Sequence, residues 1–341
     1  MSSPFLALSP QERRDALDYA AAAAGRPAHL LEKDIMVVWA LAVLGASPFD
    51  EHLVFKGGTS LSKAYGAIAR FSEDIDLTYD IRAIAPDLVA GGKDGLPATN
   101  SQQKVWTKQI RERLQLWVEA EVAPLFDRAL APASIEARID VRDNATLNIA
   151  YTPVAEGSGY VEPRVQLEFG ARSTGEPAER REIVCDAAAN LSELEFPTAR
   201  PRVMLAERTF WEKATAIHVF CKQGRFRGGD RFARHWYDLV RLDDAGIADR
   251  ALADAALAAD VARHKRIFFA EKDEAGAPID YDAATAGALV LVPADGALQS
   301  LATDYAKMVE DRLLLDEASP FEELMARCAA LADRANALDG R

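Results

Sequence analysis

The feature that most limits the possible folds is a short apolar run that stops at two glycines. Residues 53–55 (Leu-Val-Phe) precede Gly57 and Gly58, and apolar residues then recur at helical spacing over 61–69. This order predicts a strand, a glycine turn and a helix. A second strand is predicted over 75–79, with acidic residues at its start.

Two of these acidic residues, Asp74 and Asp76, are separated by a single residue. Side chains at i and i+2 of a strand point to the same face, and two carboxylates there repel each other unless a cation lies between them. Such a pair is common, and by itself it indicates no more than a solvated strand end.

The glycine turn gives the acidic pair its context. Glycines let the backbone approach a phosphate, and a helix that begins there offers free N–H groups, although two glycines alone indicate only a tight turn. Thirteen residues separate Ser60 from Asp74. Carboxylates bridge Mg²⁺ ions, two of them in this chemistry, which bind a triphosphate and lower the pKa of an attacking hydroxyl. The combination predicts a metal-dependent site for a nucleoside triphosphate (NTP).

The first two hundred residues mix helical and strand patterns. Two helices are predicted within 10–46, divided by Gly-Arg-Pro at 25–27, and an amphipathic helix over 105–122. A stretch rich in glycine and proline, 83–101, predicts an irregular loop. Further strands are expected over 135–141, 146–151, 164–169 and 183–184. These patterns predict an α+β class, a mixed sheet with flanking helices.

The remainder of the chain is mainly helical. A domain boundary is predicted near residue 200, which gives domains of 1–200 and 201–341. The helices of the second domain are expected over 205–222, 231–245, 248–263, 299–315 and 321–336.

Composition and charge narrow the class of partner. With 49% hydrophobic residues and a net charge of -13, the chain can bury a core but is unsuited to coating nucleic acid non-specifically. A confined anionic ligand, such as a nucleotide or an RNA end, is indicated by six basic residues against two acids over 222–241. The basic ones are Lys222, Arg225, Arg227, Arg231, Arg234 and Arg241.

Location follows from what the sequence lacks. No signal peptide and no apolar window of membrane-spanning length is recognisable. The three cysteines have no metal-ligand spacing and are expected to be buried thiols. The prediction is a cytoplasmic protein.

Three motifs resemble one known family. They are Gly-Gly-Thr-Ser-Leu at 57–61, Arg-Phe-Ser-Glu-Asp-Ile-Asp-Leu at 70–77 and Arg-His-Trp-Tyr-Asp-Leu at 234–239. In this order, over roughly residues 30–245, they look like the AbiEii/AbiGii toxin family. These are polymerase-β-like nucleotidyltransferases that include the MenT toxins. The resemblance implies a nucleotidyltransferase core followed by a helical region that contributes to the active site.

The resemblance also implies roles for residues at matching positions. Asp74 and Asp76 would be catalytic and hold the metal ions, and Glu168 is the candidate third ligand on a later strand. Lys213 would contact the nucleotide phosphates, and Asp238 would be a carboxylate needed for activity. Ser72 would line the nucleotide site. The glycine turn and its borders supply the other candidates for nucleotide binding, which are Lys56, Gly57, Gly58, Thr59, Ser60 and Arg70.

Several of these residues have a simpler interpretation. Glu168 alternates with apolar residues, as an outward-facing strand residue does. Lys213 is compatible with a solvated helix face. Asp238 follows Arg234 by four residues, the spacing of an ordinary ion pair within a helix.

The residues that border these motifs are open to two readings. Arg70 and Lys56 contact phosphate, or they pair with Glu73 and Glu51. The basic loop 224–230 suits an RNA backbone or a triphosphate tail, or it is a solvated turn. The histidines of the helical region receive no acid–base role, because metal ions activate the hydroxyl in this chemistry.

The predicted function is Mg²⁺-dependent transfer of a nucleoside monophosphate from an NTP to a hydroxyl, with release of pyrophosphate. The family resemblance implies a tRNA 3′ end as acceptor and a toxin role in a toxin–antitoxin or phage-defence system. It also implies a separately encoded antitoxin with a winged-helix DNA-binding domain. The alternatives are transfer to a protein side chain or a small molecule, and a catalytically idle nucleotide-binding regulatory module.

Overall fold

The chain forms two units that are interleaved in sequence. The computed structural model describes residues 3–72, 74–92, 96–157, 161–226, 231–310 and 314–337. The first unit consists of Met1–Ala64, Glu73–Leu96 and Lys104–Met204, and the second of Tyr65–Ser72, Pro97–Gln103 and Leu205–Arg341. Two short segments from the first half of the chain therefore belong to the second unit, which a single boundary near residue 200 does not anticipate.

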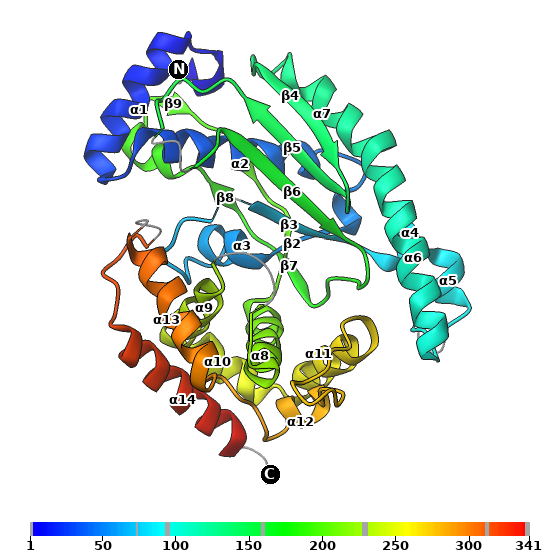
Figure 1. Cartoon of the computed structure of the whole chain (residues 1–341). Coiled ribbons are helices and arrows are strands. Elements are labelled where there is room, and N and C mark those ends of the chain that lie inside the picture. The colour runs from blue at the N-terminus through cyan, green and yellow to red at the C-terminus, as the bar shows by residue number, and fades with distance from the viewer. Residues whose placement is uncertain are drawn as a thin grey trace. The chain divides into compact units, whose positions relative to one another are not determined.

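A mixed seven-stranded sheet is the centre of the first unit (Figure 1), as the strand patterns predict. Its order is β4-β5-β6-β3-β2-β11-β7, with β3 parallel to β6 and antiparallel to β2. The strands are β2 (Leu53–Lys56), β3 (Asp74–Tyr79), β4 (Ala137–Arg142), β5 (Thr146–Tyr151), β6 (Arg164–Gly170), β7 (Ala178–Arg180) and β11 (Arg202–Met204). Two small ladders pair β1 (Ser3–Pro4) with β9 (Leu194–Glu195) and β8 (Ile183–Val184) with β10 (Thr198–Ala199).

Local sequence signals set the first helices. Ser9 and Glu12 form a capping box at the start of α1, which ends at Gly25 with φ of 65°. The next helix, α2, is buried over most of its length and packs against β6. The helices of this unit are α1 (Pro10–Ala24), α2 (Ala28–Gly45), α3 (Gly57–Lys63), α4 (Ile81–Ile84), α5 (Pro86–Ala90), α6 (Asn100–Trp117) and α7 (Ala123–Leu130).

Three sequence-based boundaries in this unit are wrong. The helix after the glycine turn ends at Lys63 rather than Ala69, because the chain leaves for the second unit from Tyr65. The loop expected over 83–101 contains the end of α4 and the whole of α5, which begin at an aspartate cap and at a proline. The helix expected to end at 122 continues through a π-helical turn over Val118–Val122 into α7.

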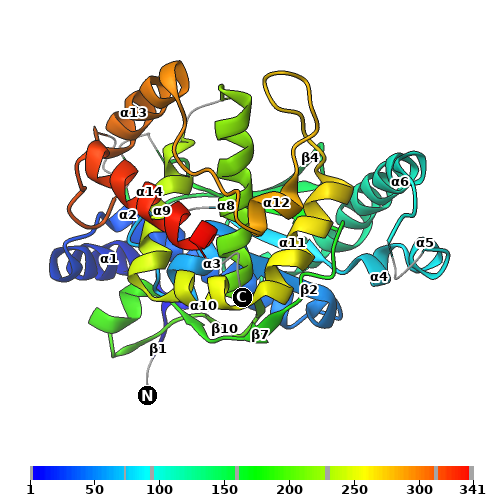
Figure 2. The same cartoon turned by 90° about the horizontal axis from the view of Figure 1, so that it is seen from below.

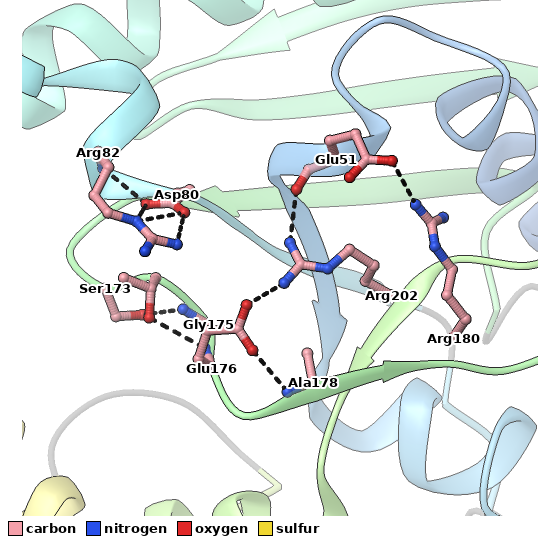
Figure 3. Close-up of polar contacts among 10 residues, drawn as sticks. Glu51, Asp80, Arg82, Ser173, Gly175, Glu176, Ala178, Arg180 and Arg202 are labelled. Atoms are coloured by element: carbon pink, nitrogen blue, oxygen red, sulfur yellow. Dashed lines mark hydrogen bonds and ion pairs between the residues drawn. The ribbon is translucent and has the colours of Figure 1, made fainter.

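Ion pairs fix the sheet edge next to β2. Arg202 pairs with Glu176, and its guanidinium also donates to the main-chain oxygen of Glu51 at 2.7 Å (Figure 3). Arg180 pairs with Asp50 at 2.6 Å. Both arginines therefore bind the segment that leads into β2, the strand that ends at the glycine turn.

The second unit is helical, as predicted. Its central helix, α8, packs against α9, α10, α11 and α12 (Figure 2). The helix expected over 248–263 is interrupted at Asp254, whose carboxylate accepts from the Leu257 amide and starts a new helix. The helices are α8 (Ala206–Gln223), α9 (Ala233–Asp244), α10 (Ile247–Ala253), α11 (Ala255–Phe268), α12 (Tyr281–Thr285), α13 (Asp295–Glu310) and α14 (Phe321–Ala337).

Two expectations about the whole chain concern thiols and membranes. Cys185 and Cys328 are buried, Cys221 is half-buried, and all three are free thiols rather than disulfides. Within the described ranges, no helix combines the length and the apolar character that crossing a bilayer demands.

Candidate active site

The acidic residues predicted from the sequence lie on one face of the central strands. Asp76 on β3 is opposite Lys56 on β2 and opposite Glu168 on β6. Asp74 projects from the same face of β3 two residues earlier, and both aspartates are half-buried. On β6 the opposite face is apolar and buried, so Glu168 is exposed on the aspartate side. Three adjacent strands thus bring these side chains to one surface of the first unit.

The glycine turn and the second aspartate are in direct contact. Gly57 has φ of +78°, a conformation that disfavours any side chain. A Cβ atom built on Gly57 would lie 2.0 Å from Oδ2 of Asp76. The carboxylate therefore occupies the space of the missing side chain, which requires glycine at this position.

The hydroxyls after the glycines hold the turn together. Thr59 Oγ1 donates to the main-chain oxygen of Asp74, and Ser60 Oγ donates to that of Gly57 at 2.9 Å. Both side chains are buried. Gly57 and Gly58 form the first turn of α3. Thr59 thus joins this helix to the strand that carries the aspartates, and a contact of its hydroxyl with nucleotide stays a prediction.

The carboxylate pair fits a divalent metal ion. Asp74 and Asp76 offer hard oxygen ligands on one side of a strand, and Mg²⁺ uses one or two carboxylates together with water and substrate phosphates. Among the described residues, no group of three His, Cys, Asp or Glu side chains is close enough to hold a metal. Glu168 instead accepts a hydrogen bond from Gln166 at 2.6 Å. Its part in metal binding stays a prediction.

A buried ion cluster that sequence reasoning missed anchors the other end of α3. The ammonium of Lys63 lies 2.6 Å from Asp34 and 2.7 Å from Asp186, and Asp186 also pairs with Arg26. Burial lowers the pKa of Lys63, but the two carboxylates outweigh it and hold this pKa above its ordinary value. The available signal was Asp34 itself, a charge inside the otherwise apolar and buried α2.

A second buried cluster lies within the second unit. Asp238 on α9 is fully buried and accepts from Nε and Nη2 of Arg70 at 2.6 and 2.7 Å. Lys213 on α8 lies 2.8 Å from the same carboxylate. Burial by itself raises the pKa of Asp238, but the two cations overcome this and hold it well below its usual range. Asp238 is therefore a carboxylate anion clamped between two cations.

The simpler interpretations of these two residues are wrong. Lys213 is 8% exposed and is not on a solvated helix face. The partners of Asp238 are Arg70 and Lys213, not Arg234 on its own helix. Because both oxygens of Asp238 are engaged and enclosed, any effect on catalysis passes through the cations that it positions.

The remaining predicted residues are distributed between the units. Lys56 is half-buried in the first unit, whereas Ser72 is half-buried in the second. Glu73, the alternative partner of Arg70, lies outside the described residues, as does 227–230 of the basic loop.

The first unit is a mixed sheet with flanking helices that carries paired carboxylates beside a glycine turn, an arrangement that suits metal-dependent phosphoryl chemistry. A family model described as "Nucleotidyl transferase AbiEii toxin, Type IV TA system" matches residues 39–327. The chain belongs to this family and is a nucleotidyltransferase toxin of a toxin–antitoxin system. A cognate antitoxin and a nucleotide substrate follow from that membership.

Solved structures of similar proteins match nearly the whole chain at low identity. JHP933 from Helicobacter pylori is 16% identical over 91% of this chain and 93% of its own, with a TM-score of 0.42. MenT4, a nucleotidyltransferase toxin from Mycobacterium tuberculosis H37Rv, is 18% identical over 97% and 99%, with a TM-score of 0.41. A putative nucleotidyltransferase from H. pylori is 16% identical over 91% and 95%, with a TM-score of 0.43. No curated protein matches the sequence.

Proposed function

We propose that this toxin is an Mg²⁺-dependent enzyme that transfers a nucleoside monophosphate from an NTP to the 3′ end of tRNA. The observation that carries the proposal is the contact between Gly57 and the Asp76 carboxylate, which brings a glycine turn and a carboxylate pair together. In the reaction, the acceptor oxygen bonds to the α-phosphorus as the bond to pyrophosphate breaks, and the acceptor hydroxyl gives up its proton.

The first unit supplies the groups for this step. Asp74 and Asp76 would hold Mg²⁺, with Glu168 the candidate third ligand on the same face. When bound, the metal neutralises phosphate charge and lowers the pKa of the attacking hydroxyl. Lys56, opposite Asp76 in the sheet, adds positive charge beside the carboxylates, and Thr59 keeps the turn in place against β3.

The acceptor is proposed from the family and from charge. Basic residues of α8 and α9 and of the segment before α9 would suit an RNA backbone. Arg241 is partly neutralised by Asp244 and Asp316, each at 3.2 Å. We further propose a cytoplasmic site of action, a part in phage defence and an antitoxin with a winged-helix DNA-binding domain.

The test is transfer of label from each α-³²P-labelled NTP to total tRNA in Mg²⁺. Asp74→Asn would remove a proposed metal ligand with little change of shape. Asp140→Asn on β4 is the control, because Asp140 pairs with Arg142 at 2.5 Å. Label on tRNA with wild type and with the control, but not with Asp74→Asn or in EDTA, supports the proposal. Label on protein favours the alternative acceptor, and NTP binding without transfer favours a regulatory module.

A further inference from the structure

The two buried lysine clusters have opposite charge balances. In the first unit, Lys63 lies between two carboxylates, Asp34 and Asp186, and its pKa is raised. In the second unit, Lys213 shares the single carboxylate of Asp238 with Arg70. Burial lowers the pKa of Lys213, and the one carboxylate does not compensate. Among the described residues, the cluster of the second unit has two cations and a single carboxylate.

Arg234 makes this imbalance larger. It lies one helical turn before Asp238 on α9, so the two residues share a helix face. Its positive charge contributes to lowering the pKa of Lys213, after the larger effects of burial and Arg70. Arg234 is half-buried, and within the described part of the chain it makes no ion pair or hydrogen bond.

The neighbouring His235 provides an independent observation that indicates a ligand. Its Nδ1 atom is buried and has no hydrogen-bond partner among the described residues. Burial, followed by the charges of Lys213 and Arg234, lowers the pKa of His235 well below its usual value, so the ring is neutral at pH 7. A neutral imidazole can place its one proton on Nδ1 and donate from there. Leaving such a buried atom without a partner is unfavourable.

We propose that Arg234 and His235, together with Lys213, bind a phosphate group within the second unit. A guanidinium, an ammonium ion and an imidazole N–H are the donors that phosphate oxygens accept from. A phosphate would supply the negative charge that Asp238 alone does not. These donors fit the triphosphate of an NTP and a phosphate of the acceptor RNA equally. The choice between these two ligands rests on the proposed function, whereas the phosphate site itself does not.

The test measures binding of inorganic triphosphate in EDTA by calorimetry. Arg234→Gln is expected to weaken binding about ten- to hundredfold, the range for losing a charged hydrogen bond, and Arg234→Lys is expected to retain part of it. Arg263→Gln on α11 is the control, because Arg263 lies outside the basic segment 222–241 and pairs with Asp260 at 2.7 Å. Circular dichroism and thermal unfolding verify that each variant is folded.

A second measurement addresses His235 directly. In ¹⁵N-histidine spectra, triphosphate should shift the Nδ1 resonance of this ring in the wild type and not in Arg234→Gln. Competition by NTP assigns the phosphate to the nucleotide, and competition by tRNA assigns it to the acceptor. Absence of triphosphate binding, or binding unchanged in Arg234→Gln, overturns the inference. Asp74→Asn should still bind triphosphate, so failure of nucleotidyl transfer alone counts against the proposed function and not against this site.

Discussion

The Asp76 carboxylate stands where any side chain at Gly57 would have to be, with 2.0 Å between Oδ2 and the position of a Cβ. The sequence suggested that the glycine makes room for a phosphate. The structure gives a different reason, because the group that needs the space belongs to the protein. The glycine turn and the carboxylate pair are therefore one structural feature, although eighteen residues of sequence lie between Gly57 and Asp76.

Gly57→Ala is expected to abolish most nucleotidyl transfer. The new methyl group displaces Asp76, and a shift of about 1 Å in a reacting group costs about a hundredfold in rate. The backbone strain at φ of +78° adds about 1 kcal/mol of destabilisation. Steady-state transfer assays and urea unfolding measure the two effects.

The matched control for this substitution is Gly25→Ala. Gly25 also has positive φ, at +65°, but no described atom beyond its neighbours in the helix and chain lies within 4 Å of its added Cβ. Gly25→Ala should lose about 1 kcal/mol through the same backbone strain and keep its activity. If Gly57→Ala retains activity close to that of this control, the contact with Asp76 does not matter for the reaction.

Local chemistry was readable from the sequence where the residues that decide it are neighbours. The strand that carries Asp74 and Asp76 and the period-two strands of the sheet were predicted and are present. In each case the alternation of residue types within the segment itself identifies the strand, although its pairing partners lie elsewhere in the chain.

The ion pairs between residues far apart in the sequence could not be predicted from the sequence. Arg70 and Asp238 are 168 residues apart, and the local alternative for Asp238, a pair with Arg234, was equally compatible with the sequence. Helix ends were misplaced for the same reason, since α3 stops at Lys63, whose charge is held by Asp34 and Asp186. Tertiary contacts decide these features, and spacing alone does not report them.

Lys63→Met is expected to destabilise the protein by about 3–5 kcal/mol, because it leaves Asp34 buried without its cation, whereas Asp186 keeps Arg26. Lys108→Met, at an exposed helix position near Glu112, should change stability by less than about 0.5 kcal/mol. Adding Asp34→Asn to Lys63→Met should recover part of the loss in chemical denaturation. If the double variant is as unstable as the sum of the single changes, the two residues are not coupled.

Stability should also fall in acid through Asp238. The pKa of this carboxyl is depressed in the folded state, so the unfolded chain takes up its proton first as the pH falls. Its contribution is complete above about pH 5 and is lost progressively below about pH 4, the ordinary carboxyl range. Urea unfolding of the wild type and of Asp238→Asn between pH 7 and pH 3 measures this contribution.

The prediction concerns the difference in free energy of unfolding between the wild type and Asp238→Asn. At pH 7 Asp238→Asn should be less stable by about 3–5 kcal/mol, because Arg70 and Lys213 lose their shared counterion. That difference should shrink as the pH falls below about 4. A difference that stays constant down to pH 3 would show that another group, and not Asp238, carries the acid dependence.

Thr59→Val separates two roles for one hydroxyl. Thr59 Oγ1 donates to the main-chain oxygen of Asp74, and losing a buried hydrogen bond of this kind costs about 1–3 kcal/mol. If the hydroxyl acts by holding Asp74, kcat should fall about tenfold with little change in KM for the NTP, and Thr59→Ser should restore it. The control, Thr215→Val, removes a buried hydroxyl that donates to Trp211 O at 2.7 Å and should cost stability alone. A raised KM with unchanged kcat would instead mean that Thr59 contacts the nucleotide itself, because an interaction made equally in the ground and transition states changes binding without changing the chemical step.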